Sequence, residues 1–398
     1  MRPFPPNQPA ILYFSSFAAV GWGGQESLWH LVSRLDPREF RPVVVLPHAG
    51  SLSERLLGHG VDVRFVELPR VAATNIRSMI QAERSLLSII DQERIGILHT
   101  DGPRNTLYAG IAGKLKRKPV VWHVRTSTAD PYDRLLYLFC SKIILVADCL
   151  TDRFRFSCRE DKFITIHNGV DVNQFAPGAP NRERIRAFGF RADDIVITVS
   201  ARVEALKGQR YVIEACARLH HLLPRLQIVF AGDIIEGAYH RACIQRAHEL
   251  GVTKHVHFPG HVENIGQLLQ DTDILVLPSI EGEAFPRAVL EAMASGIPVV
   301  ATDCGGTREA VENNVCGFVV QPTDSTEMAR RIAILSEDSI LRSRMGRAGR
   351  KIAVERFGIE RNVTRTVDVY RKIIQSKGAV HAWAIQSNGL PKSREARS

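Results

Sequence analysis

Short apolar runs recur along almost the whole chain, separated by segments with helical spacing. Near-continuous apolar runs are typical of strands buried on both faces, and their alternation with helices predicts parallel sheets covered by helices on both sides. The pattern therefore predicts an α/β fold with two doubly wound, Rossmann-like sheets. The expected strands are residues 10–14, 42–46, 61–66, 95–98, 120–123, 142–146 and 163–166 in the first series, and 194–199, 227–231, 255–258, 273–277, 299–301 and 317–320 in the second.

The two series meet at a stretch rich in turn residues. Asn168-Gly169 is a turn signal, and the cluster Pro177–Pro180 is typical of an interdomain linker. We therefore expect a first domain over residues 9–175 and a second over residues 176–358. Two doubly wound sheets that face each other place ligand sites in the central cleft, at the carboxyl ends of their strands.

The end of the chain divides into two parts. Residues 359–375 have the spacing of an amphipathic helix, whereas residues 376–398 mix Gly, Ser, Lys and Arg with little apolar periodicity. We expect the first part to be helical and the tail to be disordered.

Composition limits the class of protein. The net charge is +10, but Lys and Arg are scattered and not interleaved with aromatic residues, which argues against a nucleic-acid partner. No apolar run reaches the roughly 18 residues that a membrane-spanning helix needs. The seven cysteines are an odd number without a Cys-x-x-Cys pair, and the first nine residues lack the features of a signal peptide. We therefore expect a protein of the reducing cytoplasm.

One dense basic cluster, residues 114–118, lies at the end of an expected helix. Cations there offset the helix dipole and would simply stabilise the helix end. They could equally form a basic face that rests on anionic lipid, which would place the protein at the inner face of the plasma membrane. The sequence leaves both interpretations open.

The segment 281–300 places a helix between two strands and carries two glutamates. Pro286 lies where a first helical turn begins, and Gly-Ile-Pro at 296–298 ends the helix. Glu283 and Glu291 are eight residues apart, about two helical turns, which would place both carboxylates on roughly the same side. Unpaired N–H groups at the helix start add an anion site. The segment therefore predicts an anion cradle with two acceptors for sugar hydroxyls.

This segment resembles the signature of the nucleotide-sugar glycosyltransferases of the GT-B fold, most closely family 4, in which seven residues separate the two glutamates. Arg202 and Lys207-Gly208 resemble the family's Arg, four residues, Lys-Gly motif, which grips the donor diphosphate. Gly23-Gly24 resembles the family's Gly-Gly-x-Glu loop, which faces the donor phosphates across the cleft. The motifs stand in the family's order up to the final helix, which the resemblance implies crosses back onto the first domain.

The resemblance implies a donor-binding role for each matched residue of the second domain. Arg202 and Lys207 would stabilise charge on the departing diphosphate, as preorganised cations do. Glu291 would hold the ribose hydroxyls. Glu283 would hold the donor sugar together with the backbone of its three successors, Ala284, Phe285 and Pro286.

Two histidines are implied on the opposite side of the cleft. Family members commonly carry a histidine at the position of His123, where it reaches the transferred sugar near the reacting centre. His99 occupies a similar strand end, and Asp101 stands where the family often has a second histidine. We therefore assign His99 and Asp101 to the acceptor side.

The sequence Asp271-Thr-Asp273 looks like the metal-binding motif of the other main glycosyltransferase fold. It falls between an expected helix end and a strand, and we interpret it as a structural turn. Because Arg202 and Lys207 would supply the positive charge, we expect no required divalent metal and no cofactor.

The resemblance implies the function of a retaining glycosyltransferase. It would move a hexosyl group from a nucleoside diphosphate sugar to a glycan or lipid-linked acceptor, in the synthesis of bacterial cell-surface polysaccharide or lipopolysaccharide. Two alternatives stay open. One is a nucleotide-sugar 2-epimerase of the same fold, which needs no acceptor. The other is a non-catalytic basic adaptor that binds RNA or membranes on a transferase scaffold.

Overall fold

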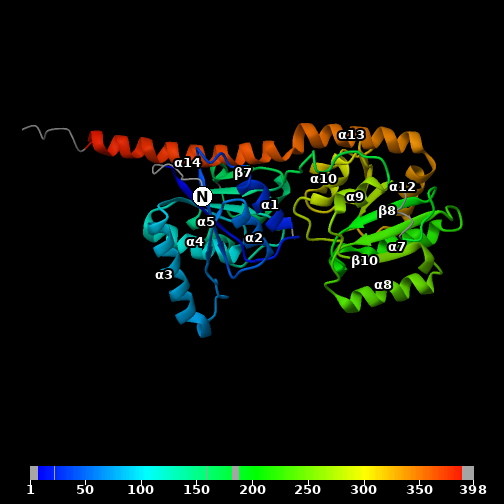
Figure 1. Ribbon diagram of the computed structural model, residues 1–398, viewed down its shortest axis with the longest axis horizontal. Helices are drawn as coiled ribbons and strands as arrows, with labels where there is room; N and C mark the ends of the chain where they lie inside the picture. Colours follow the sequence, from blue (N-terminus) through cyan, green and yellow to red (C-terminus); the bar gives the residue numbers. More distant parts are fainter. Residues whose placement is uncertain (1–7, 22, 158, 182–187, 388–398) are drawn as a thin grey trace, which may run out of the picture.

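The computed structural model describes residues 8–387 apart from residues 22, 158 and 182–187, and its side chains as far as Ser376. Two α/β domains lie side by side, each built on one parallel sheet flanked by helices (Figure 1). The predicted fold class is confirmed.

The first domain contains a seven-stranded sheet in the order β3-β2-β1-β4-β5-β6-β7. Because β1 lies between β2 and β4, the chain order reverses beside it, and such a switch point opens a crevice at the carboxyl end of the strand. The strands are β1 (Ala10–Phe14), β2 (Arg41–Leu46), β3 (Asp62–Phe65), β4 (Ile95–Thr100), β5 (Val120–Val124), β6 (Lys142–Leu145) and β7 (Phe163–Thr165). The helices are α1 (Gly23–Val32), α2 (Ser51–Gly58), α3 (Ile76–Gln92), α4 (Pro103–Lys116) and α5 (Asp133–Phe139).

Burial explains where the apolar pattern held and where it failed in this domain. In α3, Ala82, Leu86 and Ile89 recur at helical spacing and are buried on one face. Strand β4 runs two residues beyond its expected end because His99 and Thr100 are polar yet buried. A search for apolar runs does not detect a strand end formed by polar residues such as His99 and Thr100.

The second domain contains a six-stranded sheet in the order β10-β9-β8-β11-β12-β13. Here β8 lies between β9 and β11, which makes its carboxyl end the second switch point. The strands are β8 (Ile195–Ser200), β9 (Leu226–Ala231), β10 (Val256–Gly260), β11 (Ile274–Leu277), β12 (Val299–Thr302) and β13 (Gly317–Val320). The helices are α7 (Gln209–Leu219), α8 (Gly237–Glu249), α9 (Ile265–Gln270), α10 (Arg287–Ala294), α11 (Thr307–Ala310), α12 (Ser325–Glu337) and α13 (Ser339–Phe357).

The last helix, α14 (Ile359–Ser387), returns from the second domain along the first (Figure 1). Its residues Val363, Val367 and Tyr370 are buried in one apolar cluster with side chains of β1 and β2. The helix runs twelve residues beyond the expected end at residue 375, since residues 376–387 contain no proline and several good helix formers. That part of the expected disordered tail is therefore helical, and residues 388–398 lie outside the described residues.

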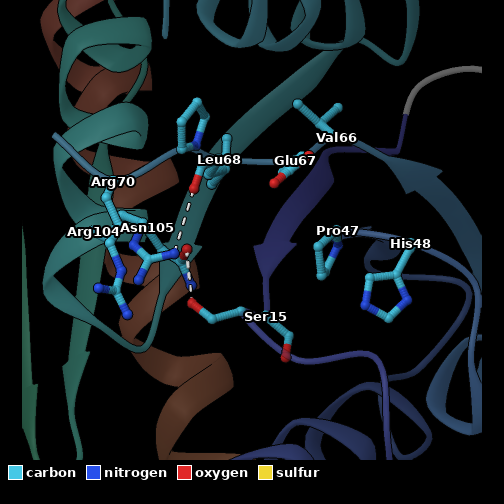
Figure 2. A pocket seen from close by; sticks show the side chains of 11 residues that line it. Ser15, Pro47, His48, Val66, Glu67, Leu68, Arg70, Arg104 and Asn105 are labelled. Atoms are coloured by element: carbon cyan, nitrogen blue, oxygen red, sulfur yellow. Dashed lines mark hydrogen bonds between the residues drawn. The ribbon is translucent and has the colours of Figure 1, made fainter. Parts of the chain in front are cut away.

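A cavity of about 330 Å³ opens in the first domain beyond the carboxyl ends of its strands (Figure 2). Side chains and loops that follow β1, β2 and β3 and the start of α4 line it. The lining residues are Ser15, Ser16, Pro47, His48, Val66, Glu67, Leu68, Pro69, Arg70, Arg104 and Asn105.

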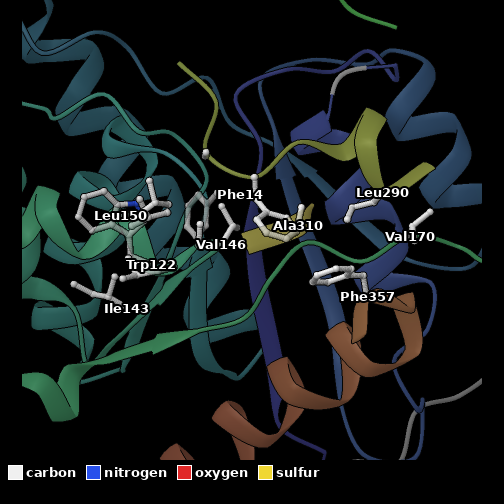
Figure 3. Close-up of a cluster of buried hydrophobic side chains, with 14 of the residues drawn as sticks. Phe14, Trp122, Ile143, Val146, Leu150, Val170, Leu290, Ala310 and Phe357 are labelled. Carbon is white, nitrogen blue, oxygen red and sulfur yellow. The ribbon is translucent and has the colours of Figure 1, made fainter. Parts of the chain in front are cut away.

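The two domains share one apolar cluster at their junction (Figure 3). Val146 and Leu150 of the first domain belong to the same buried group as Leu290 and Ala310 of the second. Phe357, at the end of α13, joins them just before the chain crosses back. The two domains therefore share part of one apolar core at their junction.

Candidate functional site

The loop after β8 requires glycine at one position. Gly208 has a φ of +68°, and a Cβ added there would lie 2.1 Å from the carbonyl oxygen of Pro278 at the end of β11. Only glycine combines this backbone conformation with so close an approach. The short 3₁₀ turn Ala205–Lys207 is thereby held against the loop that follows β11.

Lys207 and Glu283 meet at this contact. The Lys207 ammonium forms an ion pair with the Glu283 carboxylate, which also accepts a 2.7 Å hydrogen bond from the Ser279 hydroxyl. Their side chains keep 16% and 12% of their accessible surface. The structure thus brings together two of the residues expected at the donor site, a cation for phosphate and a carboxylate for hydroxyls. Arg202 forms its ion pair with Glu204 at 2.8 Å and is 42% exposed.

Glu291 has a different cationic partner. The Arg287 guanidinium lies 3.4 Å from its carboxylate, and burial raises the pKa of Glu291 although Arg287 opposes that shift. Helix α10 begins at Arg287, so Glu283 lies in the preceding loop. The two glutamates therefore do not share one helix, and the expectation that helical spacing relates them was wrong.

Arg287 also reaches across the cleft. Its guanidinium donates a 3.3 Å hydrogen bond to the Ser27 hydroxyl on α1, and a Cβ at Gly23 would lie 3.2 Å from its side chain. The glycine loop of the first domain therefore faces α10 of the second. Sequence reasoning missed Arg287, although its spacing of four residues from Glu291 was a usable signal.

The backbone beside Glu283 is enclosed by a second glycine turn. Gly305 has a φ of +53°, and a Cβ added there would lie 1.6 Å from the Glu283 carbonyl oxygen. The next residue, Gly306, donates its N–H to the Ala284 carbonyl at 3.0 Å. These contacts fix the start of α10, whose first N–H groups have no intrahelical partner.

The opposite wall of the cleft consists of buried rings from distant segments. His99 and His123, at the ends of β4 and β5, have ring centroids 5.5 Å apart. Tyr370 of α14 is joined to His99 Nδ1 by a 2.7 Å hydrogen bond, and Tyr13 of β1 packs on His99 at 5.3 Å. Burial, and then Arg125, lowers the pKa of His99 to about 3 and lowers that of His123 in the same way. Both imidazoles are therefore neutral at pH 7.

Arg125 sets the tautomer of His123. Its guanidinium donates to His123 Nδ1 at 3.2 Å, and because arginine can only donate, the neutral ring carries its proton on Nε2. That buried Nε2–H has no hydrogen-bond partner within the part of the chain that the structure describes. It is a donor suited to a sugar hydroxyl. Burial lowers the pKa of Arg125 to about 10, although nearby Asp101 favours its charged form.

Asn168, in the expected interdomain turn, connects the two walls. Its side-chain oxygen accepts a 3.0 Å hydrogen bond from Arg125, and its amide donates to the Phe285 carbonyl at 3.0 Å. Asp101 accepts a 3.0 Å hydrogen bond from Asn105, and burial raises its pKa. The His123 ring is thus joined through Arg125 and Asn168, by three hydrogen bonds, to the loop that carries Glu283.

One group of residues with metal-ligand chemistry lies beside these walls, since the His167 ring stacks on Phe285 at 4.6 Å. Asp148, His167 and Glu309 bring ligand atoms within 4.8 Å of one another at the domain junction. Glu309 there accepts hydrogen bonds from the backbone N–H groups of Asp148 and Cys149, and its carboxylate lies 3.0 Å from His167 Nε2. These contacts connect the second domain to the first. In the sequence Asp271-Thr-Asp273, Asp273 accepts the Val196 N–H at 2.9 Å, which ties β11 to β8.

Comparisons with known proteins agree with this architecture. A family model described as "Glycosyl transferases group 1" matches residues 181–352, and one described as "Glycosyltransferase Family 4" matches residues 22–174. EpsD of Bacillus subtilis, assigned to the glycosyltransferases, is 32% identical over 72% of this chain and 79% of its own length. The chain therefore belongs to the group 1, family 4-like glycosyltransferases of the GT-B fold.

Two further proteins illustrate the range of relatives. The UDP-Gal:alpha-D-GlcNAc-diphosphoundecaprenol alpha-1,3-galactosyltransferase of Escherichia coli is 25% identical over 75% of this chain and 82% of its own length. The crystal structure of HepE from Anabaena in complex with UDP superposes with a TM-score of 0.80 at 22% identity, over 91% of this chain and all of that one. This last likeness supports the fold.

Proposed function

We propose that this chain is a retaining hexosyltransferase that uses a nucleoside diphosphate sugar as donor. Arg202 and Lys207 hold the diphosphate and stabilise the charge that develops as it leaves. Glu283 and the backbone of residues 284–286 hold the sugar, and Glu291 holds the ribose. His123 positions the sugar from the opposite domain.

Two observations together carry the proposal: the contact of Lys207 with Glu283 in the second domain, and the buried Nε2–H of His123 in the first, which has no partner among the described residues. A donor diphosphate entering the cleft would compete with Glu283 for Lys207, releasing the carboxylate for a sugar hydroxyl. A double displacement needs a carboxylate nucleophile. On the acceptor side, Asp101 is instead hydrogen-bonded to Asn105 and lies near Arg125. We therefore favour front-face displacement, in which the leaving oxygen assists deprotonation of the acceptor, over a double displacement.

The proposed reaction needs no divalent metal and no cofactor. Two cations face the position of the diphosphate, and they can perform the charge stabilisation for which other transferases use a metal ion. Transfer that persists after extensive chelation would support this part of the proposal. Activity that is lost on chelation and restored by Mg²⁺ or Mn²⁺ would contradict it.

The acceptor is proposed to be a glycan or a lipid-linked sugar of bacterial surface polysaccharide or lipopolysaccharide synthesis. The Escherichia coli relative supports it, since that protein is named for transfer to a diphosphoundecaprenol-linked sugar. Among the described residues, no helix has the length and apolarity to cross a bilayer. We place the protein in the cytoplasm, with the basic cluster 114–118 and its exposed Leu115 against the membrane face.

The first test measures the thermal stability of the intact chain with UDP, GDP and ADP and their sugar conjugates. A ligand at about 100 times its dissociation constant stabilises by roughly 2.7 kcal/mol. A shift with one base, followed by acceptor-dependent release of that nucleotide, supports transfer. Donor turnover in the absence of any acceptor would instead favour the 2-epimerase. Failure of every nucleotide to bind would favour the adaptor.

A further inference from the structure

The cavity of the first domain lies next to Asp101, a residue expected on the acceptor side. Its volume of about 330 Å³ lies within the range of small-ligand pockets. Asn105 in its wall accepts a 3.2 Å hydrogen bond from Ser16 and donates to Asp101 at 3.0 Å. Gln25 of α1 donates to Ser15 at 3.3 Å. A molecule in this cavity would therefore adjoin both the glycine-loop helix and Asp101.

Two arginines give the cavity an unbalanced positive charge. Arg70, Arg104 and Asn105 gather on one wall, opposite Pro47 and His48 (Figure 2). Arg104 donates to the Leu68 carbonyl at 3.5 Å. Among the described residues, no carboxylate lies within 4 Å of either guanidinium.

Other arginines of the same domain behave differently. Arg41 and Arg64, close by in sequence, both form ion pairs with Glu93. Glu67 lines the cavity yet pairs with neither of its arginines. Two neighbouring guanidinium groups that face a cavity without carboxylate partners suit a phosphate, whose oxygens arginine binds bidentately.

The start of α4 adds donors to the same wall. Arg104 and Asn105 are the second and third residues of this 14-residue helix, where backbone N–H groups have no intrahelical partner. The N-cap is Gly102, which has no side chain to accept from them. The positive end of the helix dipole therefore reinforces the two arginines.

We propose that this cavity binds a phosphate group of the acceptor, held by Arg70 and Arg104 next to the hydroxyl that receives the sugar. The inference rests on the proposed transferase function and narrows its acceptor to a sugar phosphate or a sugar diphosphate linked to lipid. It also assigns specificity to two residues outside the donor motifs.

The test measures binding calorimetrically to the intact chain saturated with the nucleoside diphosphate that it prefers, so that the donor phosphate site is filled. The probes are N-acetylglucosamine 1-phosphate, neutral N-acetylglucosamine, glucuronate and a short-chain polyprenyl diphosphate carrying N-acetylglucosamine. The variant is Arg70→Ala with Arg104→Ala. Its matched control is Arg77→Ala with Arg84→Ala, which removes two exposed arginines of α3 that do not line the cavity.

We expect the 1-phosphate to bind at least tenfold more weakly to the cavity variant than to the parent and control chains, with nucleotide affinity unchanged. Tighter binding of the polyprenyl diphosphate would identify a lipid-linked source, and equal or weaker binding a free sugar phosphate. Glucuronate binding as tightly as the 1-phosphate would overturn the assignment to phosphate. So would a 1-phosphate affinity equal to that of the neutral sugar or unchanged in the cavity variant. Failure of every nucleoside diphosphate to bind would instead defeat the proposed function itself.

Discussion

The two walls of the cleft differ in burial and charge. On the second domain, Lys207 and Glu283 stay partly exposed and pair with each other. On the first domain, His99 and His123 are buried, and burial lowers the pKa of each. Groups that bind a diphosphate must remain charged and reachable, whereas rings that shape a sugar pocket serve best as neutral donors of fixed tautomer. The residues of the second domain's wall lie in short sequence motifs. The rings of the first domain's wall are brought together only by three-dimensional packing.

Removing the Lys207 cation from the second domain's wall should have the largest effect on turnover. Lys207→Ala should lower kcat at least 100-fold, about 2.7 kcal/mol of transition-state stabilisation, because the ammonium acts on charge that develops during departure of the diphosphate. Steady-state release of nucleoside diphosphate measures it. Lys207→Arg keeps the charge and is the matched control. Turnover of the alanine variant within a few-fold of the parent would remove Lys207 from the proposed role.

The close approach that positions Lys207 predicts a stability effect. Gly208 and Gly251 have φ values of +68° and +70°, but a Cβ would strike the Pro278 carbonyl only at Gly208 and would meet nothing within 4 Å at Gly251. Gly251→Ala should cost about 1–2 kcal/mol from the left-handed backbone alone. Gly208→Ala should lose about 1–3 kcal/mol more because the loop must also move. Urea unfolding measures both, and equal losses would show that the contact at Pro278 is unimportant.

These two walls also show what the sequence could predict. The contact of Lys207 with Glu283 joins two short motifs that the sequence already marked, because Lys207-Gly208 and Glu283 resemble the family's motifs. The partner of Glu291 was not predicted, although Arg287 lies four residues before it on the same helix. Tyr370 could not be assigned, since its hydrogen bond to His99 joins residues 271 positions apart. Such a contact leaves no periodic pattern in the sequence.

The fold was predictable from the burial pattern and did not depend on these motifs. Alternating apolar runs indicate burial on both faces, and the thirteen expected ranges each coincide with a strand, within a few residues. The helix end at residue 375 was wrong because apolar periodicity fades there, while helix propensity continues to Ser387.

Burial of His99 should affect the pH dependence of the free energy of unfolding. Burial holds the pKa of His99 at about 3, against about 6.5 in an unfolded chain, so the unfolded state binds the extra proton between these values. This group therefore lowers the free energy of unfolding as pH falls from 6.5, by about 1.4 kcal/mol per unit. The His99→Gln variant should lose roughly 2 kcal/mol less than the parent between pH 7.5 and pH 5 in urea unfolding. Parallel pH profiles would mean that His99 has the same pKa in the folded and unfolded states, and would contradict the shift attributed to burial.

The smallest expected effect comes from the link between the walls. Asn168→Asp keeps an acceptor for Arg125 but cannot donate to the Phe285 carbonyl, whereas Asn168→Ala loses both bonds. One neutral hydrogen bond contributes about 0.5–1.5 kcal/mol, so we expect kcat/KM to fall about fivefold for the aspartate variant and further for alanine. Since Asn168 touches both domains, donor KM and acceptor KM should rise together. The control, Asn362→Ala, removes only a bond to the His167 carbonyl at the same junction. If Asn168 variants raised one KM alone, the walls would act independently, and Asn168 would serve only the domain whose KM changed.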